Sequence, residues 1–182
     1  MTDSPHSTAA DSEPDSIDPA TLRERPDVVY EEATAVYDDL EDFERGVRDT
    51  AVVGVTNGEG EVCCFVNEGR GFAGLPWEPV SDDNWLDAAY SSIEDWCTGT
   101  GLAISIDGAE LVRRVEHEVV GDDEPRAATH TILFRASPVE ADPALENLAG
   151  SDDWDAGWYD GVPDAAPATP DEVADDIRRF VG

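Results

Sequence analysis

Apolar positions between residues 85 and 96 recur at the spacing of one helix face. The stripe consists of Trp85, Ala88, Ala89, Ser92, Ile93 and Trp96. Intervals of three and four residues place such positions on the same side of an α-helix. The acidic residues Asp83, Asp87, Glu94 and Asp95 lie largely off this stripe. The pattern therefore predicts an amphipathic helix, capped by Asp82 or Asn84 and ended by the glycines at 99 and 101.

Runs of β-branched and aromatic residues predict strands on both sides of this helix. They cover residues 28–36, 50–55, 61–67, 102–106, 109–120, 127–136 and 156–160. Between two of these runs, residues 57–60 read Asn-Gly-Glu-Gly, which is a strong hairpin signal. We therefore expect residues 61–67 to return as the partner strand of residues 50–55.

Helical patterns flank the predicted strands at both ends of the chain. A short helix is expected from residue 18 to 25, and an amphipathic one from 38 to 48. At the C-terminal end, Thr169 is expected to cap a helix whose first position is Pro170. The apolar stripe of this last helix consists of Val173, Ile177 and Phe180.

The order of these features resembles the motif of the Nudix hydrolase family. Leu75-Pro76 matches the lead-in of that motif, and Ala88-Ala89 and Ile93 match positions in its helix. Further on, residues 156–160 (Ala-Gly-Trp-Tyr-Asp) followed by Val162-Pro163 resemble a late strand and turn of the family. The resemblance covers about residues 50–164. It implies an α/β/α sandwich with a mixed central sheet, the predicted helix on one side and the C-terminal helix on the other.

The chain departs from the family at the positions that carry its chemistry. Ser91-Ser92 stands where the family has Arg-Glu, and Asp95-Trp96 where it has Glu-Glu. The family's glutamates hold divalent cations, for which Mg²⁺ requires oxygen ligands in near-octahedral geometry. The resemblance thus implies a nucleotide- or diphosphate-binding protein with weak or lost hydrolysis. The alternative is an active metal-dependent hydrolase of a nucleoside diphosphate linked to another moiety.

Several residues are candidates for the site that the resemblance implies. The metal candidates are Asp95, Glu94 and Glu78, which would hold Mg²⁺ or Mn²⁺ if the protein is active and no cofactor otherwise. Glu116 and Glu94 are the catalytic candidates, and Trp77, Arg113 and Arg114 are the substrate-binding ones. Each also has an ordinary structural interpretation: a solvated acidic face, arginines that balance nearby carboxylates, or aromatic packing, which we expect for Trp85 and Trp96. His117 and His130 lie on opposed predicted strands and are expected to be neighbours, either as a half-exposed neutral pair or as a metal site.

The charge balance is extreme. The chain has 11 Lys+Arg, all of them Arg, against 43 Asp+Glu, and its formal net charge is −32. The carboxylates are spread along the whole chain, as in proteins of salt-accumulating halophiles, whereas disorder or mimicry of nucleic acid fits the five Trp and the periodic segments less well. We expect a disordered acidic tail at 1–18, an N-terminal extension at 19–49, the Nudix-like domain at 50–164 and a packed C-terminal helix at 165–182.

The remaining sequence features concern location and partners. Three cysteines without a CxxC pair or zinc spacing suggest buried structural thiols in a reducing compartment. The N-terminal residues do not read as a signal peptide, and no stretch approaches a membrane span. We therefore expect a cytoplasmic protein whose partner is a small-molecule nucleotide diphosphate, with neither nucleic acid nor membrane. The oligomeric state stays open, a homodimer included.

Overall fold

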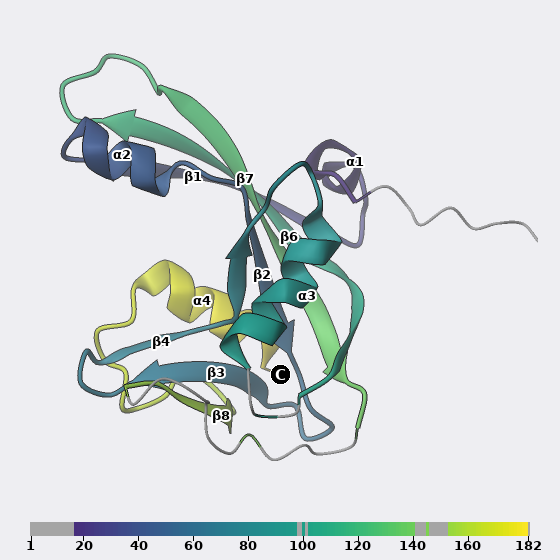
Figure 1. The fold of residues 1–182 in the computed structure, drawn as a ribbon. Coiled ribbons are helices and arrows are strands. Elements are labelled where there is room, and N and C mark those ends of the chain that lie inside the picture. The colour runs from purple at the N-terminus through teal and green to yellow at the C-terminus, as the bar shows by residue number, and fades with distance from the viewer. Residues whose placement is uncertain (1–16, 98–99, 101, 141–144, 146–152, 182) are drawn as a thin grey trace, which may run out of the picture.

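The computed structural model describes residues 17–97, 100, 102–140, 145 and 153–181 of the chain (Figure 1). The predicted disordered tail lies outside the described residues as far as residue 16. Asp18, at its end, caps the first helix by accepting hydrogen bonds from the backbone N–H groups of Ala20 and Thr21. In the part of the chain that is described, no helix is long and apolar enough to cross a membrane.

A mixed five-stranded sheet forms the centre of the molecule. Its order is β1 (Val29–Tyr37), β6 (Ile104–Val119), β7 (Ala127–Pro138), β2 (Thr50–Val55) and β5 (Trp77–Pro79). β1 runs parallel to β6 and β2 parallel to β7, whereas the β6–β7 and β2–β5 pairs are antiparallel. The sequence predicted the two segments of β6 at 102–106 and 109–120 as separate strands. They form one long strand with register irregularities near Gly108.

A second, smaller sheet packs against the first and shows one prediction to be wrong. It is antiparallel, in the order β4 (Phe72–Gly74), β3 (Val62–Asn67) and β8 (Asp155–Tyr159). The turn at residues 57–60 forms, since the Asn57 N–H donates to the Glu61 carbonyl. The strands on either side of it nevertheless separate after a single bridge between Thr56 and Val62, and β2 and β3 enter different sheets. The expected hairpin is therefore only a turn.

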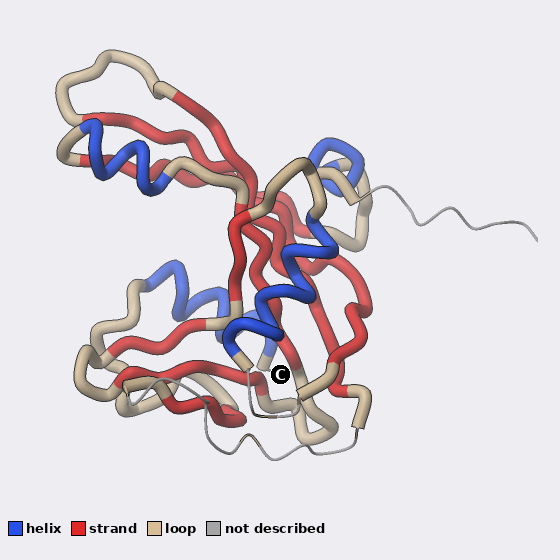
Figure 2. Tube along the Cα trace, viewed as in Figure 1, coloured by secondary structure: helices blue, strands red, loops and turns tan. Residues whose placement is uncertain are grey.

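Helices cover both faces of the central sheet, which confirms the predicted α/β/α class. They are α1 (Pro19–Arg23), α2 (Leu40–Gly46), α3 (Trp85–Trp96) and α4 (Asp171–Phe180). α3 packs on β2 and β5 at the front of Figure 1, and α4 contacts β2, β3 and β4 on the other side. Figure 2 shows the outer ends of β1, β6 and β7 projecting with α2 away from this body.

Two apolar clusters hold the helices on the sheet. On the α3 side, Ala89 and Ile93 pack with Val53 and Ile132, all at most 4% exposed. On the α4 side, Ile177 and Phe180 pack with residues of the opposite sheet face, among them the fully buried Leu111 and Leu133. The predicted stripes of both helices therefore face the core.

α4 begins differently from the sequence prediction. Pro170 occupies the N-cap, and no side chain caps the helix. The Thr169 hydroxyl instead donates to the Ala166 carbonyl oxygen and accepts the Ala73 N–H. Thr169 thus ties the start of α4 to β4, one wall of the cavity described next.

Candidate functional site

A cavity of about 250 Å³ lies where β4, β5, the end of α3 and the start of α4 meet. Aromatic rings form much of its wall: Phe65, Phe72, Trp77, Trp96 and Trp154. Arg113, Glu172 and Asp176 supply its charged groups. The cavity thus combines an apolar wall with a few polar groups, as small-molecule sites do.

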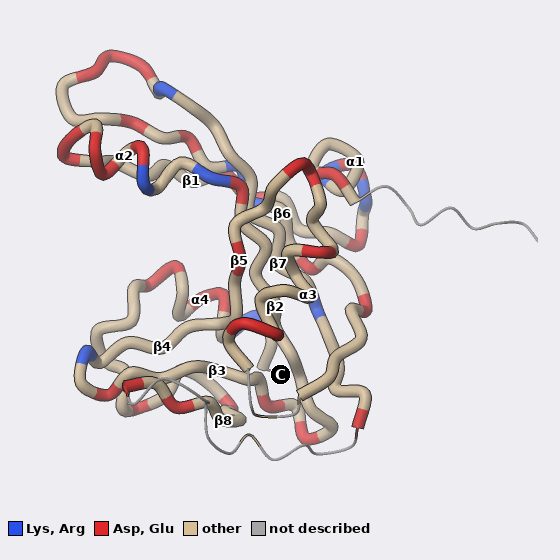
Figure 3. Tube along the Cα trace, viewed as in Figure 1, with Lys and Arg blue, Asp and Glu red and all other residues tan. Residues whose placement is uncertain are grey.

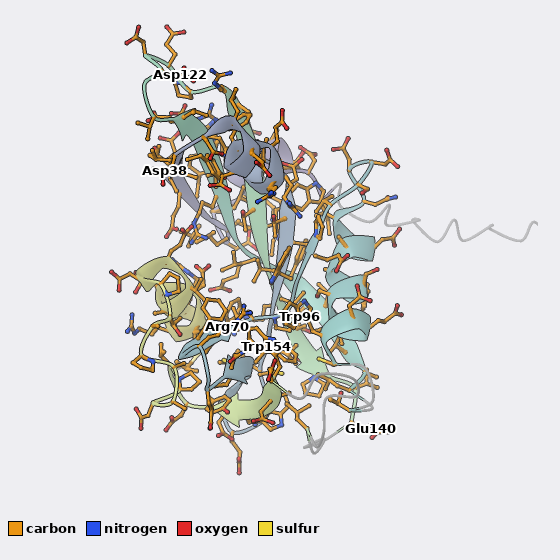
Figure 4. All side chains as sticks on the ribbon, turned by 60° about the vertical axis from the view of Figure 1, so that its left-hand side comes forward. Asp38, Arg70, Trp96, Asp122, Glu140 and Trp154 are labelled. Atoms are coloured by element: carbon orange, nitrogen blue, oxygen red, sulfur yellow. The ribbon has the colours of Figure 1, made fainter. Side chains whose placement is uncertain are left out.

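The rings of the cavity are held at steep angles to one another. The centroids of Trp96 and Trp154 are 5.7 Å apart with their planes at 82°, and the two side chains lie side by side in Figure 4. Phe72 meets Trp154 at 86°, and Trp77 meets Trp96 at 45°. The Trp96 indole N–H donates to the Trp77 carbonyl oxygen over 3.0 Å, which fixes the end of α3 against β5.

The sequence identified only part of this aromatic wall. Trp77, a substrate-binding candidate, lines the cavity and is 40% exposed. Trp96 lines it as well, in addition to packing on Phe65, with centroids 5.1 Å apart. Trp85 is core, at 2% exposed, as predicted. Trp154 was missed, because nothing local links the start of β8 to the end of α3.

Arg113 lines the cavity but is engaged by three carboxylates. It donates to both Asp176 oxygens, over 2.7 and 3.2 Å, and to Glu31 over 3.1 Å, and it lies 3.2 Å from Glu172. Burial alone would lower the pKa of Arg113, but these carboxylates raise it above its usual value. The guanidinium therefore joins β1, β6 and α4 rather than standing open for a phosphate.

Arg114 and Glu116 lie away from the cavity. The Arg114 guanidinium donates to Glu116 over 2.7 Å, and both side chains are part-exposed. Their positions on β6 lie opposite His130 and Ala128 of β7, toward the projecting end of the sheet. The structure therefore does not bring these two candidates together with Glu78, Glu94 or Asp95.

Glu78 and Asp95 are brought together. Glu78 stands on β5 opposite Ala51, and Asp95 is in the last turn of α3. Burial, a hydrogen bond with Asp95 and the charge of that neighbour raise the pKa of Glu78 above its usual value. Two neighbouring carboxylates repel each other when both are ionised, so a proton or a cation between them is favoured.

The positions expected to complete a metal cluster are filled by other groups. Ser92 is fully buried, and its hydroxyl donates to the Ala89 carbonyl oxygen over 2.6 Å, so it is part of the helix packing. Glu94, next to Asp95, is exposed on α3. Among the described residues, no group of three or more His, Cys, Asp or Glu is arranged to hold a metal ion. Of the metal candidates, Glu78 and Asp95 together offer the one or two carboxylates with which proteins commonly bind Mg²⁺.

The two histidines of the projecting hairpin are not neighbours, contrary to the prediction. His130 lies opposite Arg114, whereas His117 lies opposite Ala127. His117 is buried instead between Tyr37 and Thr129, whose oxygens are 2.9 and 2.7 Å from its Nδ1 and Nε2. Burial lowers the pKa of this imidazole. His117 is therefore a neutral packing residue, and no histidine pair forms.

The three cysteines are free and buried, as expected. A hydrogen bond with Cys97 and burial raise the pKa of the Cys63 thiol, and burial raises the pKa of Cys64 to about 12. Such thiols stay protonated at neutral pH and are poor nucleophiles. They serve packing in this structure.

No protein-family model matches the sequence, and no curated protein does. Solved structures similar to this chain include two NUDIX hydrolases from Nitrosomonas europaea. One is 13% identical with a TM-score of 0.49, covering 73% of this chain and 87% of its own. The other is 17% identical with a TM-score of 0.45, and the match covers 74% of this chain and 70% of that one. A MutT/nudix family protein from Enterococcus faecalis is 17% identical with a TM-score of 0.36, and the match covers 66% of this chain and 51% of that one. All three are named as Nudix proteins.

Proposed function

We propose that this chain is a Nudix-like domain that binds a nucleotide or another diphosphate compound and hydrolyses it weakly or not at all. The observation that carries the proposal is the environment of Ser92. Where the family motif has a metal-binding glutamate, this side chain is fully buried and bonded to its own helix. A hydrolase of this type needs a cation to neutralise the diphosphate and activate water.

The cavity supports the binding half of the proposal. It lies at the end of α3, the helix of the motif-like segment, and its walls are rich in tryptophan. Aromatic side chains stack on nucleobases with little preference for the base. Trp77, at the exposed edge of the cavity, offers the most accessible ring face.

The alternative, a rearranged but active metal-dependent hydrolase, is favoured by one observation. The carboxylates of Glu78 and Asp95 already lie together at the expected end of α3. Their oxygens fit Mg²⁺ or Mn²⁺, which would relieve the repulsion between them and supply the charge that a diphosphate requires. Under this alternative Glu94, next to Asp95, is a further ligand candidate.

We propose in addition that the protein works in concentrated salt. Figure 3 shows Asp and Glu spread over the helices, turns and several strands of the described chain, whereas β2, β4 and β7 carry none. Molar salt shortens the screening length to about 3 Å and so reduces the mutual repulsion of these groups. All binding measurements therefore belong in molar KCl.

Titration of the full chain with ADP-ribose and nucleoside diphosphate sugars tests the proposal, with tryptophan fluorescence and calorimetry as readouts. We expect saturable binding that Trp77→Leu weakens. Tyr90→Leu is the matched control, because Tyr90 is 42% exposed on α3 but does not line the cavity. Absence of saturable binding across these ligands, with and without Mn²⁺, would overturn the proposal.

A further inference from the structure

We propose that the aromatic cavity binds a quaternary ammonium group, so that the ligand of this site carries a fixed positive charge. The inference rests on the proposed function in one respect, since it takes this cavity to be the ligand-binding site. It adds the chemical class of the group that the cavity selects.

The angles between the rings are the first argument. Apart from Trp77, whose exposed ring can stack on a base, the rings form no parallel clamp: the Trp96–Trp154 and Phe72–Trp154 pairs meet at 82° and 86°. Rings at such angles surround a space on several sides. A compact cation in that space meets the negative face of more than one ring, which is how proteins recognise quaternary ammonium groups.

The charge of the cavity is the second argument. Arg113 and Arg179 are joined to Glu31, Glu172 and Asp176 in one network of ion pairs. Three carboxylates against two guanidinium groups leave one negative charge in excess. Asp176 is nearly buried, so this network belongs to the interior of the fold and not to the general acidic surface. Glu172, with 59% of its side chain exposed, is the most exposed of the three carboxylate side chains.

The excess charge disfavours an anion at this position. Each contact that Arg113 makes in the network is to a carboxylate, so a phosphate placed here would meet Glu172 and Asp176 before any available cation. A positive group is attracted by the same carboxylates. Salt screens this attraction less at the nearly buried Asp176 than at the exposed Glu172.

The size of the cavity agrees with a single compact group. Its volume of about 250 Å³ lies just below the range of roughly 300–1,000 Å³ that is usual for sites that enclose a whole small molecule. The quaternary group would occupy the cavity, and the remainder of the ligand would extend past the exposed Trp77 toward Glu78 and Asp95.

Choline and its neutral isostere 3,3-dimethyl-1-butanol test the inference, because they share a shape and differ in charge. Both are titrated into the full chain in molar KCl, with calorimetry and tryptophan fluorescence. Cation–π attraction in a desolvated site predicts choline binding about tenfold tighter than the isostere. Equal binding of the two compounds, or no binding of choline, would overturn the inference.

Two substitutions on the same helix locate the effect. Glu172→Gln removes the exposed carboxylate of the cavity. It should weaken the binding of choline several-fold and leave the binding of the isostere unchanged. Asp175→Asn removes an equal charge nearby, but Asp175 pairs with Arg178 and does not line the cavity, so choline binding should not change. Equal weakening by both variants would mean that general charge, not the cavity, attracts choline, and would refute the inference.

ADP-ribose, which lacks a quaternary nitrogen, separates this inference from the proposed function. If ADP-ribose binds and choline does not, the cation preference is wrong while the proposed function stands. If choline binds and no diphosphate compound does, the cavity selects cations as inferred but the proposed function fails. If the inference holds, Trp154→Leu, which removes one ring of the cavity, should weaken choline binding whether or not diphosphate compounds bind.

Discussion

Glu78 and Asp95 meet across the contact between β5 and the last turn of α3, and the pKa of Glu78 is raised by burial and by that neighbour. The two residues are 17 positions apart in the chain, but the Trp96 indole, bonded to the Trp77 carbonyl, holds their elements together. The contact therefore places two carboxylates of different elements next to each other beside the cavity.

Glu78→Gln should stabilise the fold at neutral pH. Because the folded pKa of Glu78 lies above its usual value of 4.5, ionisation of this group costs folding free energy above the folded pKa. The cost disappears as the pH falls below the usual value, where the group is protonated in both states. The urea midpoint of Glu78→Gln should thus be higher than that of the natural protein at about pH 7. The two midpoints should become equal near about pH 4.

Glu44→Gln, an exposed position on the distant α2, is the control for the loss of one negative charge. At neutral pH this control should raise the urea midpoint less than Glu78→Gln does. An identical gain from both variants would show that the Glu78–Asp95 contact is not the cause.

Arg113→Met should destabilise the protein by about 3–5 kcal/mol, because it leaves the nearly buried Asp176 without its partner. Arg114→Met, at the exposed pair with Glu116, should cost only about 0–1 kcal/mol. Urea unfolding in molar KCl measures both. Asp176→Asn added to Arg113→Met should recover part of the loss, and a double variant no better than the single one would contradict the role given to this pair.

Leu133→Ala should cost about 2–5 kcal/mol, because β7 is a central strand and this side chain is fully buried against Leu111 and α4. Val139→Ala, at a position 65% exposed just after β7, is the matched control. A cost below about 0.5 kcal/mol for Leu133→Ala would be out of line with a close-packed core.

Low salt should unfold the protein. The net charge of the chain is −32. Its carboxylates repel one another strongly once the screening length grows to about 10 Å at about 0.1 M salt. Circular dichroism should show loss of secondary structure and a falling melting temperature between molar and about 0.1 M KCl. An unchanged spectrum and melting temperature across this range would contradict the adaptation to salt.

Local periodicity was enough to predict the helices that cover the sheet. The spacing of Ala89 and Ile93 in α3, and of Ile177 and Phe180 in α4, puts each pair on a buried face of its helix. Helix faces can be read from a sequence because the geometry that defines them spans only a few residues. The strand character of residues 109–119 was likewise recognised, but not their continuity with residues 104–106 in β6.

Pairing between distant segments could not be read in this way. The turn at Asn57 is local and was predicted, but whether β2 and β3 stay together depends on β7 and β8, which lie far along the chain. The site shows the same limit. Glu78, Asp95 and Trp77 were candidates from the motif, whereas Trp154 and the carboxylates around Arg113 reach the cavity only through the tertiary fold.

Product formation at saturating ligand, measured in molar KCl with Mn²⁺, distinguishes a binding protein from a working hydrolase. The ligands are ADP-ribose, nucleoside diphosphate sugars and diadenosine polyphosphates, each at a concentration where binding is complete. We predict full occupancy with very slow hydrolysis, and no further loss of rate in Asp95→Asn or Glu78→Gln. Robust Mn²⁺-dependent turnover that either substitution abolishes would contradict the account and establish a working hydrolase built on the Glu78–Asp95 pair.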